Sequence, residues 1–387
     1  MNPFFWSEIG RSLSHWGPCH SRIRRGQVSS FYGASRMRVL VDIHHPAYFH
    51  FFRNPIRLLR EKGHEVRITA RDKDVLSGLV ESFGMKAEFF GLDSRHPVAL
   101  GIELFFRQWK LLKIIRTFEP DVIVSAAGPY ATLAGKLTGT PTLVYSDTEP
   151  ERLEHALSFP FASEILVPNC FRKPIHRFHR RFDGYKELAY LHPDYFSPDS
   201  SVLEEMGLEP GQLFCVIRLV GWDASHDIGV RSFSPADRRT VIHSLRRHVR
   251  VVISAEGELP PDLRDCRINL DVARMHHLLA FAGLVFGNSA TMCSEGAMLG
   301  VPGVYVDPLG RGYTDELERD YGLIFNYHPD QCGQALKQAV SILTDYDRQC
   351  WQNKRQRLLS DKVNVTKTVS DAILECGKHN RHHFLRS

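Results

Sequence analysis

The chain has 387 residues, 43% of them hydrophobic and 24% charged, which is the length and composition of a two-domain globular protein with ordinary buried cores. Five arginines and one acid give residues 1–36 a charge of +4 out of the total of +5, so the remainder is nearly neutral and does not favour nucleic-acid binding. The eight cysteines are scattered without a C-x-x-C pair, which argues against a zinc site and a disulfide framework.

Two further features of the sequence bear on where in the cell the protein is located. No apolar run reaches the ~18 residues that a membrane-spanning helix needs, and the N-terminus has no uninterrupted apolar signal stretch. We therefore predict a cytoplasmic protein. Residues 1–36 are rich in Ser and Arg, as transit peptides are, but we interpret them as a disordered extension or an upstream start.

From Met37 onward, short buried runs alternate with helical patterns. A β-branched strand at 38–43 is followed by an aromatic-rich helical pattern and then by a second strand, which makes a β-α-β unit. The alternation continues and predicts a parallel sheet covered on both faces. The predicted elements after the first strand are a helix at 49–62, a strand at 65–70, a helix at 74–83, a strand at 87–90, a helix at 98–118, and strands at 122–125, 142–145 and 165–167.

A polar segment rich in Gly and Pro at 183–200 separates this series from a second one. We place the domain boundary there, and two doubly wound halves in succession predict a ligand crevice at the carboxyl ends of both sheets. The predicted elements of the second series are strands at 213–220, 251–254, 267–270, 284–287 and 304–306, helices at 235–248, 272–282, 290–299 and 315–321, and a C-terminal helical stretch at 329–376.

The segment LVFGNSATMCSEGAMLGVPGVY, at 284–305, carries the strongest local signal. Its strand ends at Gly287, and small or hydroxyl residues then open a helix whose free N–H groups can bind a phosphate. Glu295 lies one turn further on the same side, where it can accept hydrogen bonds from ribose hydroxyls. The alternative is that Ser289 only caps the helix and that Glu295 is a solvated acid of its first turns.

This segment resembles the nucleotide-binding signature of the GT-B superfamily, in which such a turn, a Glu on the next helix and a Gly-Val-Pro strand entry hold a UDP-sugar. More narrowly, the chain resembles the domain of unknown function 354 family from Met37 to about Tyr327. That family is related in fold to UDP-GlcNAc 2-epimerases and nucleotide-sugar glycosyltransferases. The segments that carry the resemblance are VDIHHPAYFHFF, GYKELAYLHPDYF, GWDASHD, SAEG, MHHLLAFAGLVFGNSATMCSEGAMLGVP and DELERDYGL.

The resemblance implies a GT-B-like α/β fold of two Rossmann-like doubly wound parallel-sheet domains with an interdomain cleft. It also implies that Ser289, Ala290 and Thr291 contact the diphosphate of the donor and that Glu295 contacts its ribose. Residues 37–185 then form an acceptor domain, residues 186–345 a nucleotide-sugar-binding domain, and residues 346–387 a C-terminal helical segment and tail.

Other residues of the second half are candidates for the same site. Arg218 ends a strand and could supply a cation to the phosphates, or form a surface ion pair instead. His276 and His277 open the helix before the binding strand, in a region that contacts the base in similar folds; the alternative is a packed or solvated pair.

Two short segments of the second half follow strands and are expected to face the cleft. Trp222, Asp223 and His226 stand in GWDASHD, where an aromatic platform, an acid and a histidine suit a sugar ring or a phosphate. Trp222 could equally pack at the hinge. Glu256, in SAEG after the next strand, is a further candidate.

The first half is expected to hold the acceptor and a general base. His44 and His45 follow the first strand directly and His50 lies on the next helix, where a histidine can take a proton from an attacking hydroxyl near neutral pH. Asp147 and Glu149, after the strand at 142–145, could orient or deprotonate the substrate, or cap the helix that follows.

The helix at 104–118 mixes aromatic, aliphatic and basic residues. Such a helix could dock weakly on anionic lipid at the inner face of the membrane, which would suit a lipid-linked acceptor. The simpler interpretation is an ordinary helix that covers the sheet and has one solvated face.

We predict a metal-independent glycosyltransferase that uses a UDP-sugar as donor substrate, needs no cofactor, and transfers a hexosyl or N-acetylhexosaminyl group to a sugar or a lipid-linked acceptor in cell-surface polysaccharide or glycoconjugate synthesis. The first alternative is a non-hydrolysing UDP-GlcNAc 2-epimerase. Family resemblance would then require a catalytic Asp where this chain has AAGP at 126–129. The second alternative is a non-catalytic nucleotide-sugar-binding protein.

Overall fold

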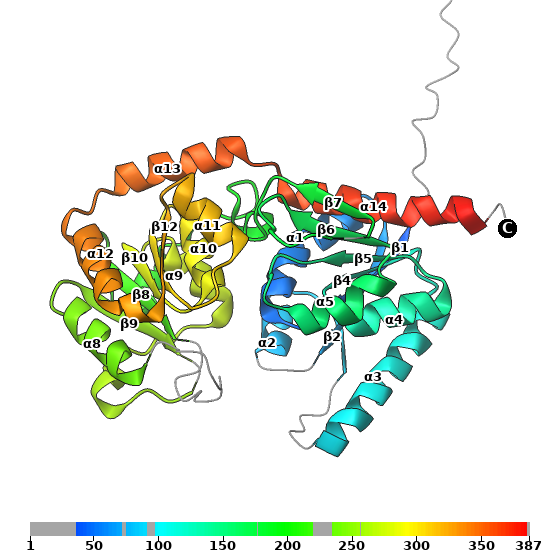
Figure 1. Cartoon of the computed structure of the whole chain (residues 1–387), viewed down its shortest axis with the longest axis horizontal. Helices are drawn as coiled ribbons and strands as arrows, with labels where there is room; N and C mark the ends of the chain where they lie inside the picture. Colours follow the sequence, from blue (N-terminus) through cyan, green and yellow to red (C-terminus); the bar gives the residue numbers. More distant parts are fainter. Residues whose placement is uncertain are drawn as a thin grey trace, which may run out of the picture. The chain divides into compact units, whose positions relative to one another are not determined.

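The structure is a computed structural model. It describes residues 36–71, 75–90, 97–175, 177–219, 234–255 and 257–384, without the side chains of 97–105 and 379–384. The described residues form two parallel β-sheets with helices packed against them, so the predicted α/β architecture is confirmed (Figure 1). In the described part of the chain, no helix is both long enough and apolar enough to cross a membrane.

The first sheet has seven strands in the order β3-β2-β1-β4-β5-β6-β7, all paired in parallel. The strand order reverses between β1 and β4, so the segments after these strands open on the switch point, where doubly wound sheets bind ligands. The strands are β1 (Arg38–Ile43), β2 (Glu65–Arg71), β3 (Glu88–Phe90), β4 (Val122–Ala126), β5 (Thr142–Tyr145), β6 (Glu164–Pro168) and β7 (His179–Phe182).

Alternating side chains of the central strands bury both faces of this sheet. Leu40 and Ile123 point to one face, where they pack in a cluster with residues of α3 and α4. Val39, Val41 and Val124 point to the other face and belong to the main core with α1. The helices of residues 46–205 are α1 (Pro46–Glu61), α2 (Leu76–Ser82), α3 (Pro97–Phe118), α4 (Pro129–Thr138), α5 (Arg152–Ser158), η1 (Phe159–Phe161), α6 (Leu188–Leu191) and α7 (Ser201–Glu205).

The second sheet has five parallel strands in the order β12-β11-β10-β8-β9, so its switch point lies between β8 and β10. The strand expected at 267–270 is wrong: the backbone there makes one isolated bridge, between Ile253 and Arg267. The strands are β8 (Phe214–Leu219), β9 (Arg250–Ala255), β10 (Leu284–Gly287), β11 (Gly303–Val306) and β12 (Ile324–Tyr327). The helices are α8 (Pro235–Leu245), η2 (Pro261–Cys266), η3 (Val272–Arg274), α9 (Met275–Leu279), α10 (Ala290–Leu299), α11 (Gly312–Arg319), η4 (Pro329–Gln331), α12 (Cys332–Thr344), α13 (Arg348–Asp361) and α14 (Val365–Phe384).

The C-terminal helices tie the halves together. Helix α13 packs on α10, where Arg355 Nε donates to the backbone oxygen of Met298. Helix α14 returns to the first half and packs along α1, and Thr366 Oγ1 donates to the backbone oxygen of Ala189 (Figure 1). Between them, Lys362 Nζ lies 2.6 Å from both Asp183 and Glu316. The helical stretch expected at 329–376 therefore consists of several helices that serve different halves.

Candidate functional site

The close approach of β8 and β10 shapes the start of α10. Gly287 has a φ of +150° and lies opposite Arg218 in the sheet register. A Cβ atom at Gly287 would collide with the backbone oxygen of Arg218, so only glycine allows this approach. Arg218 thereby stands next to the first residues of α10, and its Nη1 donates to Ser254 Oγ on β9 at 3.0 Å. This arrangement places the backbone of Arg218 beside the turn that leads into α10, while its half-buried side chain bonds to β9.

The hydroxyl of Ser289 caps α10. It accepts from the Met292 N–H at 3.3 Å, as the capping alternative predicts. The first intrahelical bond runs from the Cys293 N–H to the Ser289 oxygen, so the N–H groups of Ala290 and Thr291 precede it at the positive end of the helix. Ser289 and Thr291 are half-buried, which leaves this end of α10 accessible.

Glu295 is fixed rather than solvated. It is 6% exposed, and its Oε1 accepts hydrogen bonds from Tyr190 Oη at 2.8 Å and from His276 Nε2 at 2.9 Å. Burial alone would raise the pKa of this carboxyl, but the neighbouring His276 and the two hydrogen bonds outweigh it and lower the pKa. The alternative of a solvated first-turn acid is therefore wrong, and Glu295 is a positioned carboxylate.

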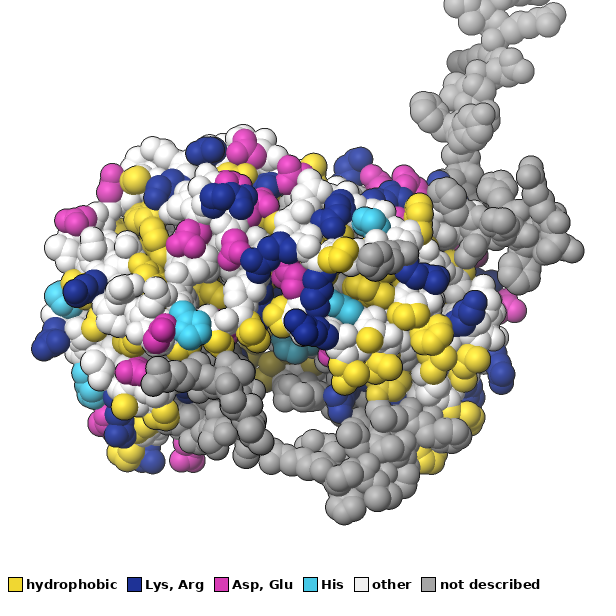
Figure 2. Space-filling model, in the orientation of Figure 1, with side chains coloured by type: hydrophobic (Ala, Val, Ile, Leu, Met, Phe, Trp, Pro, Cys, Tyr) yellow, Lys and Arg dark blue, Asp and Glu magenta, His cyan; other side chains and the backbone are white. Residues whose placement is uncertain are grey.

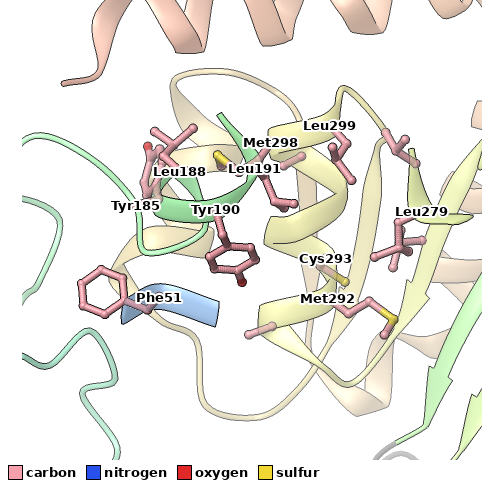
Figure 3. Close-up of a cluster of buried hydrophobic side chains, with 14 of the residues drawn as sticks. Phe51, Tyr185, Leu188, Tyr190, Leu191, Leu279, Met292, Cys293, Met298 and Leu299 are labelled. Carbon is pink, nitrogen blue, oxygen red and sulfur yellow. The ribbon is translucent and has the colours of Figure 1, made fainter. Parts of the chain in front are cut away.

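Tyr190 comes from α6, in the segment between the two sheets, and was missed by the sequence analysis. Figure 3 shows its ring between helix α10 and the part of α1 that carries Phe51. The ring centre of His50 on α1 lies 4.6 Å from that of His276, and 5.3 Å from that of Tyr190. The support of Glu295 therefore comes from three parts of the chain. Tyr190 lies in the segment GYKELAYLHPDYF, which carries part of the family resemblance, so the sequence did contain a signal for this residue.

The two neighbouring histidines of α9 have separate partners. His276 is buried against Glu295, as described above. His277 Nδ1 accepts from the backbone N–H of Asp199 at 2.9 Å, and its ring lies 4.8 Å from the ring of Phe196. Both histidines therefore join α9 to the segment that connects the halves. Their expected contact with a nucleotide base stays a prediction.

His44 and His45 follow β1 as expected but differ in their surroundings. His45 is exposed and caps α1, since its Nδ1 accepts from the Ala47 N–H at 3.2 Å. In this state its neutral ring carries its proton on Nε2, which works against a role as proton acceptor. Burial lowers the pKa of His44 to about 4, so this imidazole is neutral across the physiological range.

Asp147 belongs to a buried ionic group at the carboxyl edge of β5. Its Oδ2 lies 2.8 Å from Lys186 Nζ, which is also 3.7 Å from Glu187. Glu187 in turn accepts from Ser294 Oγ of α10 at 3.0 Å. Burial raises the pKa of Glu187 to about 7. This chain of contacts connects the expected acceptor edge of the first sheet directly to helix α10.

Glu149 makes a second connection between the halves. Its Oε1 accepts from the backbone N–H of Gly312, at the start of α11, at 3.2 Å and from that of Arg172 at 3.1 Å. A Cβ atom at Gly312 would collide with the backbone oxygen of Cys170, so the approach requires glycine. The alternative that Asp147 or Glu149 caps the following helix is wrong, because α5 begins after Glu151 without a side-chain cap.

Glu151 is a candidate that the sequence analysis did not name. Burial raises its pKa to about 8, and the nearby charges of Glu154 and Asp147 add to this effect. Its Oε2 is buried without a hydrogen-bond partner among the residues that the structure describes. The signal for it was present: Asp147, Glu149 and Glu151 alternate in YSDTEPER, directly after a buried strand. A carboxyl group that titrates near neutral pH is suited to proton transfer.

Helix α3 departs from the expected pattern of a basic face. Arg107 is buried and pairs with Asp42 on β1 at 3.3 Å, with its guanidinium 4.6 Å from the ring centre of Tyr130. Lys110 and Lys113 are exposed, together with Trp109. One arginine of the helix therefore serves the core of the first half, whereas the lysines remain on its surface.

Four expected site residues, Trp222, Asp223, His226 and Glu256, lie outside the described residues. Within the described ranges, no group of three or more His, Cys, Asp or Glu side chains is placed to hold a metal ion.

Comparisons with known proteins bear on the fold. The model of the family described as "Protein of unknown function (DUF354)" matches residues 37–364. An uncharacterized protein of Methanocaldococcus jannaschii is 23% identical over 323 residues, which are 77% of this chain and 92% of that protein. The UDP-GlcNAc 2-epimerase of Neisseria meningitidis, solved with UDP-GlcNAc bound, superposes with a TM-score of 0.60 at 13% sequence identity. The superposition covers 91% of this chain and 100% of the epimerase chain. Acinetobacter baumannii MurG superposes with a TM-score of 0.54 at 15% sequence identity, and the superposition covers 88% of this chain and 99% of the MurG chain. These likenesses confirm the GT-B fold.

Proposed function

We propose that this chain, which belongs to the DUF354 family, is a glycosyltransferase that binds a UDP-sugar in its second half and transfers the sugar to an acceptor held by the first half. One observation supports this proposal more strongly than the others. The carboxylate of Glu295 is held by Tyr190 and His276 beside a helix start that also has a half-buried arginine. Similar proteins support the ligand class, since the Neisseria meningitidis epimerase was solved with UDP-GlcNAc.

The donor site follows from these contacts. The N–H groups of Ala290 and Thr291 bind the diphosphate at the positive end of α10, and Arg218 on the neighbouring strand β8 supplies a cation to it. Glu295 accepts from a ribose hydroxyl through Oε2, since its Oε1 already accepts two hydrogen bonds. The same positive groups stabilise the charge that develops on UDP as it leaves.

The acceptor side centres on Glu151. Its ionised carboxylate takes the proton of the acceptor hydroxyl while the hydroxyl oxygen forms a bond to the anomeric carbon of the sugar. The bond between that carbon and the diphosphate oxygen breaks, and UDP leaves with the electron pair. A pKa of about 8 makes Glu151 a stronger base than an ordinary carboxylate, and the rate is expected to rise with pH up to about 8.

The end of β4 favours transfer over epimerisation at C2. Epimerisation by analogy with the 2-epimerases would need an acid in the AAGP segment. Ala126 and Ala127 are buried, and a Cβ atom at Gly128 would collide with Ser125 Oγ, so this turn is closed by small residues. Its side chains supply no group that could remove a proton from a sugar carbon.

The test combines binding with product analysis. UDP and UDP-GlcNAc are expected to raise the Tm of the wild-type chain, and Glu295→Gln is expected to weaken UDP binding about 10-fold or more while the fold stays intact. Glutamine keeps an oxygen that can accept from Tyr190 and His276. The matched control is Glu204→Gln, which changes the same charge at an exposed position of α7.

Mass spectrometry after incubation with UDP-GlcNAc and a cell extract distinguishes the three functions. A transferase releases UDP and produces a glycosylated acceptor, an epimerase produces the C2 epimer, and a binding protein returns the donor unchanged. Equal UDP affinity of wild-type protein and Glu295→Gln would refute the donor site proposed here.

A further inference from the structure

A cavity of about 280 Å³ lies where α1 and the end of α2 face α9 and the connecting segment between the sheets. Its volume accommodates a ring with one substituent. Its walls combine positive and aromatic side chains, among them Arg53, Arg57, Phe83, Phe196, His276 and His277.

Arg53 is the unusual member of this wall. The residue is 6% exposed, and its Nε and Nη1 are buried without a hydrogen-bond partner among the residues that the structure describes. Its guanidinium lies 4.1 Å from the ring centre of Phe83, a favourable contact that supplies no acceptor for its N–H groups. Buried N–H donors without an acceptor are unfavourable for folding, so this wall suits an anion that accepts hydrogen bonds from Nε and Nη1 of Arg53.

The other groups of the wall fit the same kind of ligand. Arg57 follows Arg53 by one helical turn and also lines the cavity, with its exposed guanidinium 3.2 Å from Glu61. Phe196 brings an aromatic face from the connecting segment, close to the ring of His277. The cavity therefore offers guanidinium groups for a planar oxyanion and aromatic surface for a ring.

We propose that this cavity binds a small aromatic acid, in which a carboxylate or phosphate group is held by Arg53 and the ring packs against Phe83 and Phe196. The start of α10 and Arg218 are not among the walls of this cavity, although it shares with the donor site His276, whose Nε2 bonds to Glu295. The proposal stands independently of the proposed transferase function.

Thermal-shift measurements on the full chain test this proposal. Phenyl phosphate and benzoate carry both an anion and a ring, whereas inorganic phosphate and acetate carry the anion alone. Phenyl phosphate or benzoate is expected to raise the Tm by about 1–2 °C near saturation, with a smaller effect of the ring-free ions. The larger of the two shifts identifies the preferred oxyanion.

Arg53→Met is expected to abolish these shifts, and to leave the Tm of the unliganded protein unchanged or higher, because it removes two buried nitrogens that have no acceptor among the residues that the structure describes. Arg116→Met, at an exposed position of α3, is the matched control and should keep the shifts. UDP binding is measured on the same variants, so failure of the donor site is seen separately. Equal shifts of wild-type protein and Arg53→Met, no shift of the wild-type protein with either aromatic probe, or a Tm of unliganded Arg53→Met well below that of the control would overturn the proposal.

A second inference rests on an apolar patch of the first half. Helices α3, α4, α5 and η1 contact one another in sequence, and besides Phe106 six large apolar side chains on them are between 38% and 72% exposed. Figure 2 shows hydrophobic side chains gathered over the region where Figure 1 labels α4 and α5. The apolar patch consists of Trp109, Leu133, Leu137, Leu153, Leu157 and Phe161.

The charges around this patch are mostly positive. Residues 106–118, 129–139 and 152–161 contain one acid, the half-buried Glu154. The same ranges expose five basic side chains, which are Lys110, Lys113, Arg116, Lys136 and Arg152. Apolar side chains within a basic rim are complementary to a bilayer with anionic headgroups, where the apolar groups enter the interface and the basic groups meet phosphates. A contact between two copies of this surface would instead bring like charges together.

We infer that the apolar patch docks on an anionic lipid surface. Cosedimentation of the full chain with vesicles of phosphatidylglycerol and phosphatidylcholine tests this, with pure phosphatidylcholine vesicles as the uncharged comparison. The chain is expected to bind the anionic vesicles at least several-fold better, and Leu153→Ser with Leu157→Ser is expected to reduce that binding about 10-fold or more. Leu309→Ser, at a position 52% exposed in the second half, is the matched control.

Charge removal separates the two contributions, since Lys136→Gln with Arg152→Gln should remove much of the preference for anionic vesicles. Unchanged vesicle binding of the double leucine variant would overturn the inference. So would a result in which that variant converts a dimer to a monomer and the wild-type chain binds neither kind of vesicle.

Discussion

The carboxyl ends of the two sheets carry sites that are built in different ways. In the second half, Gly287, Ser289 and Glu295 lie on one strand-to-helix segment, and neighbouring strands bring Arg218 beside it. In the first half, the edge of β5 gathers charges that are distant in sequence, with Lys186 between Asp147 and Glu187. A site on one continuous segment can be recognised from the sequence, whereas a site made of distant charges depends on the fold.

The prediction with the largest expected effect concerns the buried charges of the first half, which are distant in sequence. Lys186 is the cation of a buried group that includes Asp147 and Glu187, so Lys186→Met leaves buried carboxylates without their partner. Such a change is expected to lower the free energy of unfolding by about 3–5 kcal/mol. Chemical denaturation measures it, with Lys136→Met at an exposed position of α4 as the control.

A double variant sharpens this measurement. Adding Asp147→Asn to Lys186→Met removes one of the uncompensated charges and should restore part of the lost stability, because the two residues interact directly. A loss below about 1 kcal/mol for Lys186→Met, or additive losses in the double variant, would mean that this edge of the sheet is not held by the ionic group.

The second prediction concerns the pH dependence of the same edge. The pKa of Glu151 is raised from its ordinary value of 4.5 to about 8. Between these values the unfolded chain releases a proton that the folded chain keeps, so the contribution of Glu151 to stability is present at low pH and is lost as the pH rises toward 8. Glu151→Gln should remove this dependence and gain ~2 kcal/mol over wild-type protein between about pH 5 and pH 8.

Unfolding curves at several pH values measure this gain, with Glu204→Gln as the exposed control. The same Glu151 variant should abolish sugar transfer at every pH, because glutamine cannot take the acceptor proton. A stability difference that does not change with pH would show that Glu151 titrates as an ordinary surface acid.

These two predictions concern residues that the sequence analysis treated differently. Asp147 was recognised because it follows a buried strand, but its partner could not be found, since Lys186 lies in a polar segment with no periodic pattern. Glu151 stands two residues beyond a recognised acid, and its burial depends on neighbours from other parts of the chain. Pairing between distant charges has no local sequence signal, which is why the composition of this edge could be predicted and its connections could not.

The third prediction tests how far the local segment depends on distant residues. Tyr190 donates to Glu295 from the segment between the sheets, so Tyr190→Phe removes one of the two hydrogen bonds that hold the carboxylate. UDP binding is expected to weaken about 5- to 10-fold, equivalent to about 1 kcal/mol, through the looser position of Glu295. Isothermal titration measures it, with Tyr195→Phe, which loses a bond to Asn364 instead, as the matched control.

Equal UDP affinities for the two tyrosine variants would show that His276 alone is sufficient to position Glu295. In that case the strand-to-helix segment that carries Gly287, Ser289 and Glu295 would specify the site of the second half almost completely. A loss specific to Tyr190→Phe would show instead that the site includes the connection between the halves.

The fold shows the same division between local and distant information. The order of strands and helices followed from periodicity, because buried parallel strands such as β1 and β10 are short apolar runs between helical patterns. Strand β7, with the sequence HRRF, was not predicted because it is charged and lies at the edge of its sheet, where burial is incomplete. The return of α14 to the first half was not predicted either, since an amphipathic pattern identifies a helix but not the surface it covers.

The smallest expected effect decides which atoms of the local segment bind the diphosphate. Ser289 caps α10 through its hydroxyl, so Ser289→Ala should lower the free energy of unfolding by about 1 kcal/mol, whereas Ser289→Gly should lower it by only a few tenths. If backbone N–H groups bind the diphosphate, both variants should keep UDP affinity within about twofold, because the helix start still presents the amides of Ala290 and Thr291. A parallel loss of UDP affinity in both variants would assign the contact to the hydroxyl group, and the local segment would then depend on a side chain rather than on its backbone geometry.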